Sequence, residues 1–245
     1  MKHLLLLGMA FILAACGSPA IATPAPTPEA IQITYPTSLQ KWMDNLARCA
    51  ADYPQVALYV NQANIWIGNL SQAEAALEFA QLNTETSDFY LTQLGWEQLV
   101  VVVNQENTLS KLPTDRLTAI FSGQTSKWLG ASSLPIQVWL LPEGDPVRTL
   151  FDRIVMRGRS VSSEARLSPD AAAMLEAVAN NANSIGYLPA SWVNSGDSAV
   201  SGKVKIVQLE DSLASQLQQP IVAVTQNEPV GPMREILVCL TSHAP

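Results

Sequence analysis

Histidine, cysteine and charged residues are all scarce in this 245-residue chain. Its two histidines, His3 and His243, each stand third from an end of the sequence. Ser-His-Asp catalysis, Cys-His catalysis and His-rich zinc sites all need histidine held inside a fold, so the scarcity argues against each of them. We therefore expect a protein that is not an enzyme and that carries no metal ion and no cofactor.

Charge excludes a further class of partner. Only 14% of the residues are charged, with 14 basic against 21 acidic side chains, a net charge of −7, and no basic run along the chain. Because binding to a phosphate backbone needs a basic surface, nucleic acid is not expected as a partner. Apolar residues make up 48% of the sequence, which excludes disorder as the main state and supplies a core for one large domain or two small ones.

A short apolar run opens the chain. Residues 4–15 are apolar except for Gly8, and a helix of that length would span about 18 Å, less than the about 30 Å of a bilayer core. The run is typical of the hydrophobic part of a secretory signal. The small residues from Leu13 up to Cys16 then resemble the lipobox of bacterial lipoproteins.

This resemblance implies that residues 1–15 are a signal peptide and that lipid on Cys16 anchors the protein to the extracytoplasmic face of a bacterial membrane. An ordinary signal peptide followed by a chance cysteine is the alternative. Residues 16–30 are rich in Pro, Ala and Thr and are expected to form a tether. Export would also place Cys49 and Cys239 where a disulfide persists, and the sequence leaves open whether they form one or stay as two buried thiols.

The rest of the chain alternates β-branched runs with helical periodicity, which predicts an α/β fold with mainly parallel sheets. Strands are expected at 31–34, 56–60, 99–103, 136–141, 184–188, 204–209 and 221–225. Helices are expected at 37–50, 70–77, 114–121, from 145 onward, at 170–180 and at 233–240. The pattern starts again after Asn104, which predicts two units, each with its own sheet.

Several segments resemble a known family, and their order along the chain matters more than any one of them. They are the run from Leu94 to Asn104, Ile120-Phe121-Ser122-Gly123, Ser184-Ile185-Gly186-Tyr187 and Gln219-Pro220-Ile221-Val222. Together they are similar to the substrate-binding proteins of phosphate-type ABC transporters. The similarity extends over residues 35–241.

The resemblance implies the two-lobed fold of periplasmic binding proteins (type II). In that fold two α/β lobes, each a mainly parallel sheet flanked by helices, close on a solute by a hinge motion. Lobe 1 would comprise residues 31–103 and 205–245, and lobe 2 residues 104–204. The resemblance also implies a small-molecule solute and an ABC permease as partners, and a monomer.

In the second lobe, the family binds phosphate at a Gly-Ser-Gly-Thr turn that opens a helix, with an arginine four residues before the serine. Here that turn reads Gly-Asp-Pro-Val-Arg from Gly144 to Arg148, and Leu141 stands at the arginine position. The carboxylate, the proline without an N–H and the missing arginine each disfavour phosphate. Gly144, Asp145 and Arg148 remain candidates for another, cationic or hydroxylated, solute. The alternatives are that Asp145 caps its helix and that Arg148 pairs with Asp145 or Asp152.

The first lobe offers weaker candidates. Thr37 and Ser38, at the start of the first expected helix, keep the hydroxyl chemistry of the family, and their alternative role is to cap that helix. The family's Gly-rich turn and acidic ligand fall in segments that here contain four further candidates, Asn64, Trp66, Asn83 and Thr84. The ring of Trp66 would stack on a ring-bearing solute or, alternatively, serve packing alone.

Two functions remain open from the sequence. The first is an extracytoplasmic solute-binding lipoprotein of an ABC transport system, similar to a phosphate-binding protein but with an eroded phosphate motif. The second is a binding-protein-like module without a solute that serves surface interaction or sensing. The Asp145 carboxylate discriminates between them. If it points into a cleft beside Thr37 and Ser38 it favours binding, whereas a carboxylate turned back onto its own helix, with the cleft blocked, favours the second function.

Overall fold

The computed structural model describes residues 28–63, 74–80, 88–128, 135–194 and 198–245. Its strands are β1 (Glu29–Tyr35), β2 (Val56–Gln62), β3 (Ala75–Phe79), β4 (Tyr90–Asn104), β5 (Gln137–Leu140), β6 (Arg166–Leu167), β7 (Ser184–Pro189), β8 (Val204–Ile206) and β9 (Gln218–Thr225). Its α-helices are α1 (Gln40–Ala51), α2 (Thr114–Phe121), α3 (Pro146–Phe151), α4 (Ala171–Ala179), α5 (Ala190–Asn194), α6 (Ser198–Ser201), α7 (Asp211–Gln216) and α8 (Gly231–Ser242). A 3-10 turn, η1 (Thr37–Leu39), leads into α1, and a π-helical turn, η4 (Asp152–Met156), continues α3.

The described strands form one mixed sheet in the order β2-β1-β3-β9-β4-β7-β5-β6, with β8 paired to β4. Pairing is parallel from β1 to β2 and β3, and from β5 to β6 and β7. It is antiparallel from β9 to β3 and β4, and from β4 to β7 and β8. The α/β class is as predicted, but the expectation of mainly parallel sheets needs correction. The chain leaves one half of the molecule along β4 and returns along β9, and two such neighbouring strands must run in opposite directions.

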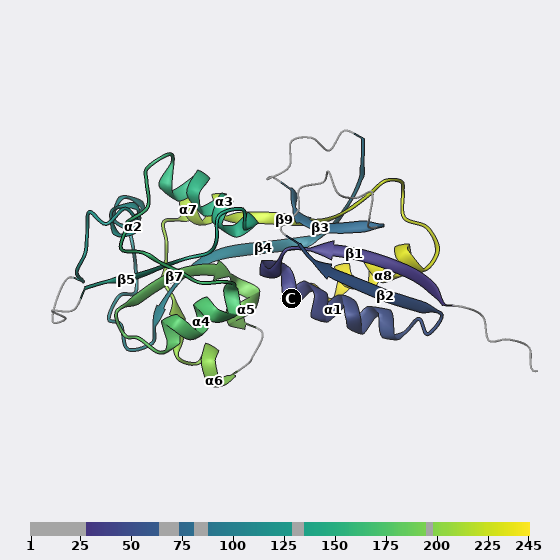
Figure 1. Ribbon diagram of the computed structural model, residues 1–245, viewed down its shortest axis with the longest axis horizontal. Helices are drawn as coiled ribbons and strands as arrows, with labels where there is room; N and C mark the ends of the chain where they lie inside the picture. Colours follow the sequence, from purple (N-terminus) through teal and green to yellow (C-terminus); the bar gives the residue numbers. More distant parts are fainter. Residues whose placement is uncertain (1–27, 64–73, 81–87, 129–134, 195–197) are drawn as a thin grey trace, which may run out of the picture.

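The 15-residue strand β4 connects the two halves. Residues 90–98 pair with β9, and residues 99–104 pair with β7 and β8. Figure 1 shows β4 and β9 running along the longest axis, with β1, β2, α1 and α8 at one end and β5, β7, α2 and α4 at the other. A Cβ on Gly95 of β4 would lie only 2.8 Å from Cη2 of Trp42, so glycine at this position lets α1 pack closely on the strand.

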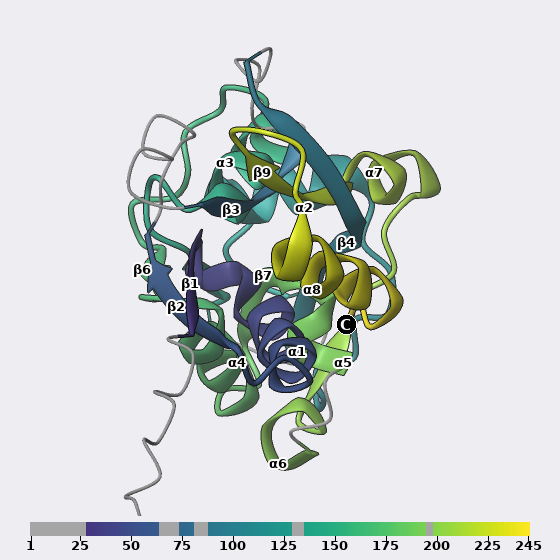
Figure 2. The ribbon, with the colours of Figure 1, turned by 90° about the vertical axis from the view of Figure 1, so that its right-hand side faces the viewer.

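Helices α1 and α8 lie side by side at one end of the molecule, although they stand near opposite ends of the described chain (Figure 2). The apolar side chains that they bury in the core are Trp42, Met43, Leu46, Met233, Ile236, Leu237 and Leu240. A disulfide joins Cys49 of α1 to Cys239 of α8, across 190 residues of sequence. Helices α1 and α8 are therefore held together by a covalent bond as well as by apolar packing.

Three expected elements need correction. The helix expected at 70–77 is wrong from Ala75 onward, because residues Ala75–Phe79 form β3 between β1 and β9, where four of its five side chains are buried. The strand expected at 99–103 is the last part of the longer β4, since residues 90–98 also pair with β9. Strand β1 begins at Glu29, which pairs with Val56, so it includes the last two residues of the expected tether.

Residues 1–27, which hold the expected signal peptide and Cys16, lie outside the described residues. Within the residues that the structure describes, no helix combines the length and the apolar character needed to cross a membrane. Lipidation of Cys16 therefore stays a prediction.

Candidate functional site

Asp145 caps the helix that it precedes. It adopts an extended conformation before α3, and its Oδ1 accepts hydrogen bonds from the backbone N–H groups of Val147 at 2.8 Å and Arg148 at 3.4 Å. Gly144 has a φ of +87°, a left-handed conformation that favours glycine, and it turns the chain into this cap. Pro146 occupies the first helical position, where its missing N–H costs no hydrogen bond. The carboxylate is thus turned back onto its own helix.

The carboxyl group of Asp145 is also buried, with 1% of the residue exposed. Burial raises the pKa of this carboxyl to about 6, and the two backbone hydrogen bonds from Val147 and Arg148 only partly oppose the increase. At neutral pH the group is mainly a buried anion. An anionic solute placed at the start of α3 would therefore meet a like charge.

The side chain of Arg148 is hydrogen-bonded to residues close to it in the sequence. Its Nε donates to Oδ2 of Asp152 at 2.7 Å, and its Nη1 donates to the carbonyl oxygen of Leu141 at 2.9 Å. The side chain is buried, so these two protein groups, and not solvent, hold the guanidinium in place. Beneath the turn, the ring of Tyr187 stacks on Phe151 with centroids 3.9 Å apart, which fixes α3 on β7. With Asp145 and Asp152 beside one arginine, this turn carries a net negative charge.

Thr37 and Ser38 lie in η1, between β1 and α1. The N-cap residues are Pro36 for η1 and Leu39 for α1, and neither makes a side-chain cap, so the capping role considered for Thr37 and Ser38 is wrong. The extra 3-10 turn moves the start of α1 beyond them. Ser38 is 1% exposed, and its hydroxyl has no hydrogen-bond partner among the described residues. An unpaired buried hydroxyl costs about 1 to 3 kcal/mol of folding free energy. A ligand that forms a hydrogen bond with the hydroxyl of Ser38 would remove this cost, which favours its binding.

A tryptophan from the other half of the molecule contacts this turn. Nε1 of Trp192, in α5, donates to the backbone carbonyl of Ser38 at 2.9 Å. The ammonium of Lys41, in α1, lies 5.0 Å from the centroid of the same indole ring, a cation–π distance. The two halves are therefore in direct contact beside the unpaired hydroxyl of Ser38.

A buried carboxylate on β4 is a feature that sequence reasoning missed. Glu97 is 4% exposed, and its Oε2 accepts from Nε1 of Trp42 at 2.9 Å. Its Oε1 accepts from the backbone N–H groups of Ser191 and Gln98, each at 3.2 Å. Burial raises the pKa of this carboxyl, and the hydrogen bonds oppose that increase. The signal in the sequence was a lone charge two residues before the apolar run 99–103.

The structure gathers the sequence-predicted residues in two places. Gly144, Asp145 and Arg148 share the turn at α3, and Thr37 and Ser38 share η1, with no hydrogen bond between the two places among the described residues. Four candidates lie outside the described residues, namely Asn64, Trp66, Asn83 and Thr84. Three cavities lined by described residues, of about 450, 370 and 380 Å³, lie elsewhere and do not include Ser38 or Asp145.

A mixed sheet whose central strands pass between two helix-covered halves is the fold of periplasmic binding proteins (Figure 1). A family model described as a PBP superfamily domain matches residues 23–236, and the chain belongs to this superfamily. The match covers both halves of the molecule, from before β1 into α8.

Solved structures with this fold include phosphate-binding proteins. A protein from Clostridium perfringens, described as a phosphate ABC transporter substrate-binding protein with bound phosphate, is 19% identical with a TM-score of 0.71, over 86% of this chain and 93% of that chain. An ABC-type phosphate transport receptor from Vibrio cholerae is 21% identical with a TM-score of 0.61, over 88% and 95%. The CcmR regulatory domain from Synechocystis PCC6803 in complex with 2-PG is 15% identical with a TM-score of 0.64, over 88% and 97%. At these identities the likeness concerns the fold, and the predicted resemblance is confirmed at that level.

Proposed function

We propose that this chain is an extracytoplasmic solute-binding lipoprotein that delivers a small molecule to an ABC permease. The superfamily fold and the lipobox-like residues up to Cys16 support this function. The observation that carries it is the buried hydroxyl of Ser38, which lacks a partner that a bound solute would supply. The solute would lie between lobe 1, residues 31–103 with 205–245, and lobe 2, residues 104–204. The role is binding and not catalysis, and the protein acts as a monomer.

The solute is proposed to be hydroxylated, and neutral or cationic, rather than simple phosphate. The buried carboxylate of Asp145 occupies the helix start and accepts from the two N–H groups that an anion would need. The guanidinium of Arg148 is already paired with Asp152. Sugars, polyols and small amines suit both the hydroxyl of Ser38 and the carboxylate of Asp145, whereas an anion suits the hydroxyl alone and is repelled by the carboxylate.

Loading the site requires the two halves to move apart. Ser38 and Asp145 are both buried in the arrangement that the structure describes, and Trp192 holds the backbone of Ser38. We therefore propose that a solute enters an open form and is enclosed when Trp192 returns to the carbonyl of Ser38. This is the hinge closure expected of the family.

A second function is favoured by the position of Asp145. The carboxylate serves as a helix cap, and the side chains of Ser38 and Asp145 are both buried, as expected of a binding-protein-like module that has lost its solute. Such a module would serve surface interaction or sensing. A regulatory domain is among the solved structures with the same fold, which is compatible with this alternative.

A thermal-shift screen of the purified protein separates the two functions. Inorganic phosphate, neutral sugars and polyols, and small polyamines are added in turn. A solute at 100 times its Kd stabilises the folded state by about 2.7 kcal/mol, which raises Tm by several degrees. We expect a shift with a hydroxylated or cationic solute and none with phosphate.

Two variants test whether the thermal shift comes from binding at Ser38. Ser38→Ala should abolish the shift, because it removes the proposed contact. Ser184→Ala is the matched control, since it also removes a buried hydroxyl, one that accepts from Trp139 away from the proposed site, and it should keep the shift. Stabilisation by phosphate would refute the proposed solute class. No shift with any solute of the panel would favour the module without a solute.

A further inference from the structure

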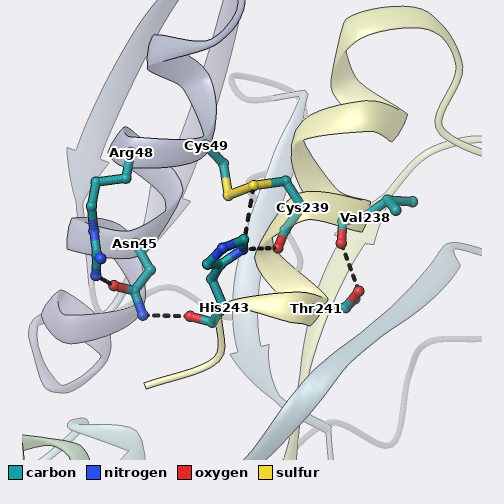
Figure 3. The surroundings of a disulfide bond; sticks show 7 residues. All are labelled: Asn45, Arg48, Cys49, Val238, Cys239, Thr241 and His243. Carbon is teal, nitrogen blue, oxygen red and sulfur yellow. Dashed lines mark hydrogen bonds between the residues drawn. A yellow bond between two sulfur atoms is a disulfide. The ribbon is translucent and has the colours of Figure 1, made fainter.

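An imidazole faces the disulfide. Nδ1 of His243, the residue after α8, lies 3.6 Å from Sγ of Cys239 and 2.9 Å from the carbonyl oxygen of Cys239 (Figure 3). A sulfur or nitrogen atom of each of Cys49, Cys239 and His243 lies within 4.8 Å of the other two. We propose that reduction of the disulfide creates a zinc site with these three residues as ligands. Sequence reasoning predicted no metal site, because the two histidines, His3 and His243, both stand near an end of the chain.

The spacing of the ligand atoms suits tetrahedral coordination. Zn–S bonds of about 2.3 Å and a Zn–N bond of about 2.0 to 2.1 Å, at tetrahedral angles, place sulfur and nitrogen about 3.6 Å apart. That is the separation of Nδ1 of His243 and Sγ of Cys239. The two sulfurs would lie about 3.8 Å apart in the same geometry. Side-chain rotation alone supplies this once the bond is reduced, because the two Cα atoms are 5.8 Å apart.

The three ligands are held in place by more than the sulfur–sulfur bond. Nδ2 of Asn45, a buried residue of α1, donates to the carbonyl oxygen of His243 at 2.6 Å. Arg48 in turn donates from Nη2 to Oδ1 of Asn45 (Figure 3). The hydrogen bond from Asn45 to His243 and the packed apolar faces join α1 to the end of α8 independently of the cysteines. The ligand set is therefore expected to persist in the reduced protein.

Solvent reaches the site from one side. His243 is exposed, and it lines a cavity of about 450 Å³ together with Asn45, Arg48 and Lys41. Three protein ligands leave the fourth position of a tetrahedral zinc ion to water, as in sites that exchange ligands. Because Cys49 is buried and Cys239 is half-buried, an added ion or a reductant reaches the site from the side of His243 and Cys239.

The chemistry has two balanced steps. A dithiol reductant gives two electrons and two protons to the Cys49–Cys239 bond and becomes a disulfide itself. Zn²⁺ then binds the two sulfurs as thiolates and displaces two protons. The imidazole of His243 binds through Nδ1 as a neutral ligand, which requires that Nδ1 give up its hydrogen bond to the carbonyl oxygen of Cys239 and that the ring carry its proton on Nε2. Oxidation removes both thiolates, so zinc occupancy depends on the redox state of this pair.

The test titrates Zn²⁺ into the full-length protein against a chromophoric chelator, after reduction with dithiothreitol and anaerobic desalting. Reduced wild type should bind one equivalent more than oxidised wild type. Cys49→Ser/Cys239→Ser is the matched control, because it keeps Cys16 and His3 and so measures all other zinc binding. His243→Ala should weaken the additional site at least tenfold.

Co²⁺ is a second probe, with a readout that does not depend on affinity. Bound to reduced wild type, it should show the visible bands of tetrahedral cobalt and sulfur charge-transfer bands, both absent from the double serine variant. Equal zinc binding by reduced wild type and the double variant would overturn the proposal. So would a cobalt spectrum without sulfur bands. Circular dichroism of the reduced protein completes the test, since unfolding on reduction would refute the argument that Asn45 and the core hold the ligands in place.

Discussion

Asp145→Asn is predicted to stabilise the protein at neutral pH and to leave its stability nearly unchanged at pH 4. Asparagine caps helices about as well as aspartate, and its side-chain oxygen can accept the same hydrogen bonds from Val147 and Arg148. The substitution therefore removes the buried charge and little else.

The size of this stabilisation follows from the pKa of Asp145. Burial raises the pKa of Asp145 from 3.8 to about 6, and about 1.4 kcal/mol corresponds to each unit, so the charge costs at most about 3 kcal/mol. Because the folded protein binds this proton more tightly than the unfolded chain, ionisation lowers stability as pH rises. The penalty is absent below the unfolded pKa, grows between the two pKa values and is complete above about pH 6.

Urea unfolding of both proteins between pH 4 and pH 8 measures the effect. The free energy of unfolding of the variant minus that of wild type should rise from near zero to a positive plateau of 1 to about 3 kcal/mol. Asp170→Asn is the matched control, since Asp170 caps α4 through the N–H of Ala173 but is only partly buried. A difference that does not change with pH, or a variant less stable than wild type at pH 7, would refute the reasoning.

Three further variants test other contacts by urea unfolding and hydrogen exchange. Cys49→Ser/Cys239→Ser opens the loop that the disulfide closes across 190 residues, and the chain entropy of the unfolded state predicts that the free energy of unfolding falls by up to about 5 kcal/mol relative to the oxidised protein. An unchanged free energy of unfolding would show that the helices alone restrain the chain. Glu97→Gln turns an amide N–H toward the indole N–H of Trp42 or leaves another donor unpaired. The free energy of unfolding is therefore expected to fall by about 1 to 3 kcal/mol at pH 7, and an unchanged value would contradict the role of this hydrogen bond. Trp192→Phe keeps a ring beneath Lys41 but removes the donor to Ser38, so backbone amides 37–39 should exchange faster, while unchanged exchange would show that the contact does not hold this turn.

The local parts of the fold were predictable from the sequence. The helix expected at 114–121 and the strand expected at 184–188 appear almost as predicted, because their periodicity and flanking residues are local signals. The pattern of residues 75–77 predicts a helix, since a short apolar run fits either period, and only the neighbours β1 and β9 make this segment a strand. The polar first part of β4 was missed for a related reason, as Tyr90 pairs with Thr225, a residue 135 positions away.

In the candidate site, too, the contacts between residues close in sequence were predictable, and the contacts between distant residues were not. The capping of α3 by Asp145 and the pairing of Arg148 with Asp152 were both foreseen as alternatives, because each depends on a spacing of at most four residues. The contact of Trp192 with Ser38 spans 154 residues and had no local signal. Burial of Glu97 against Trp42 likewise depends on how α1 packs on β4, which no pattern of alternation specifies.

The disulfide between α1 and α8 also determines how the molecule transmits mechanical force. If the chain is held by a lipid at its N-terminal side, tension applied between β1 and the end of α8 passes through Cys49 and Cys239. The 190-residue separation between them is bypassed, so residues 50–238 carry none of that tension. The turn at Ser38 lies on this short path, between β1 and Cys49, whereas the strand β4 lies off it. A protein tethered in flowing medium would thus keep β4, the strand that connects its two halves, unstretched until the sulfur–sulfur bond is reduced.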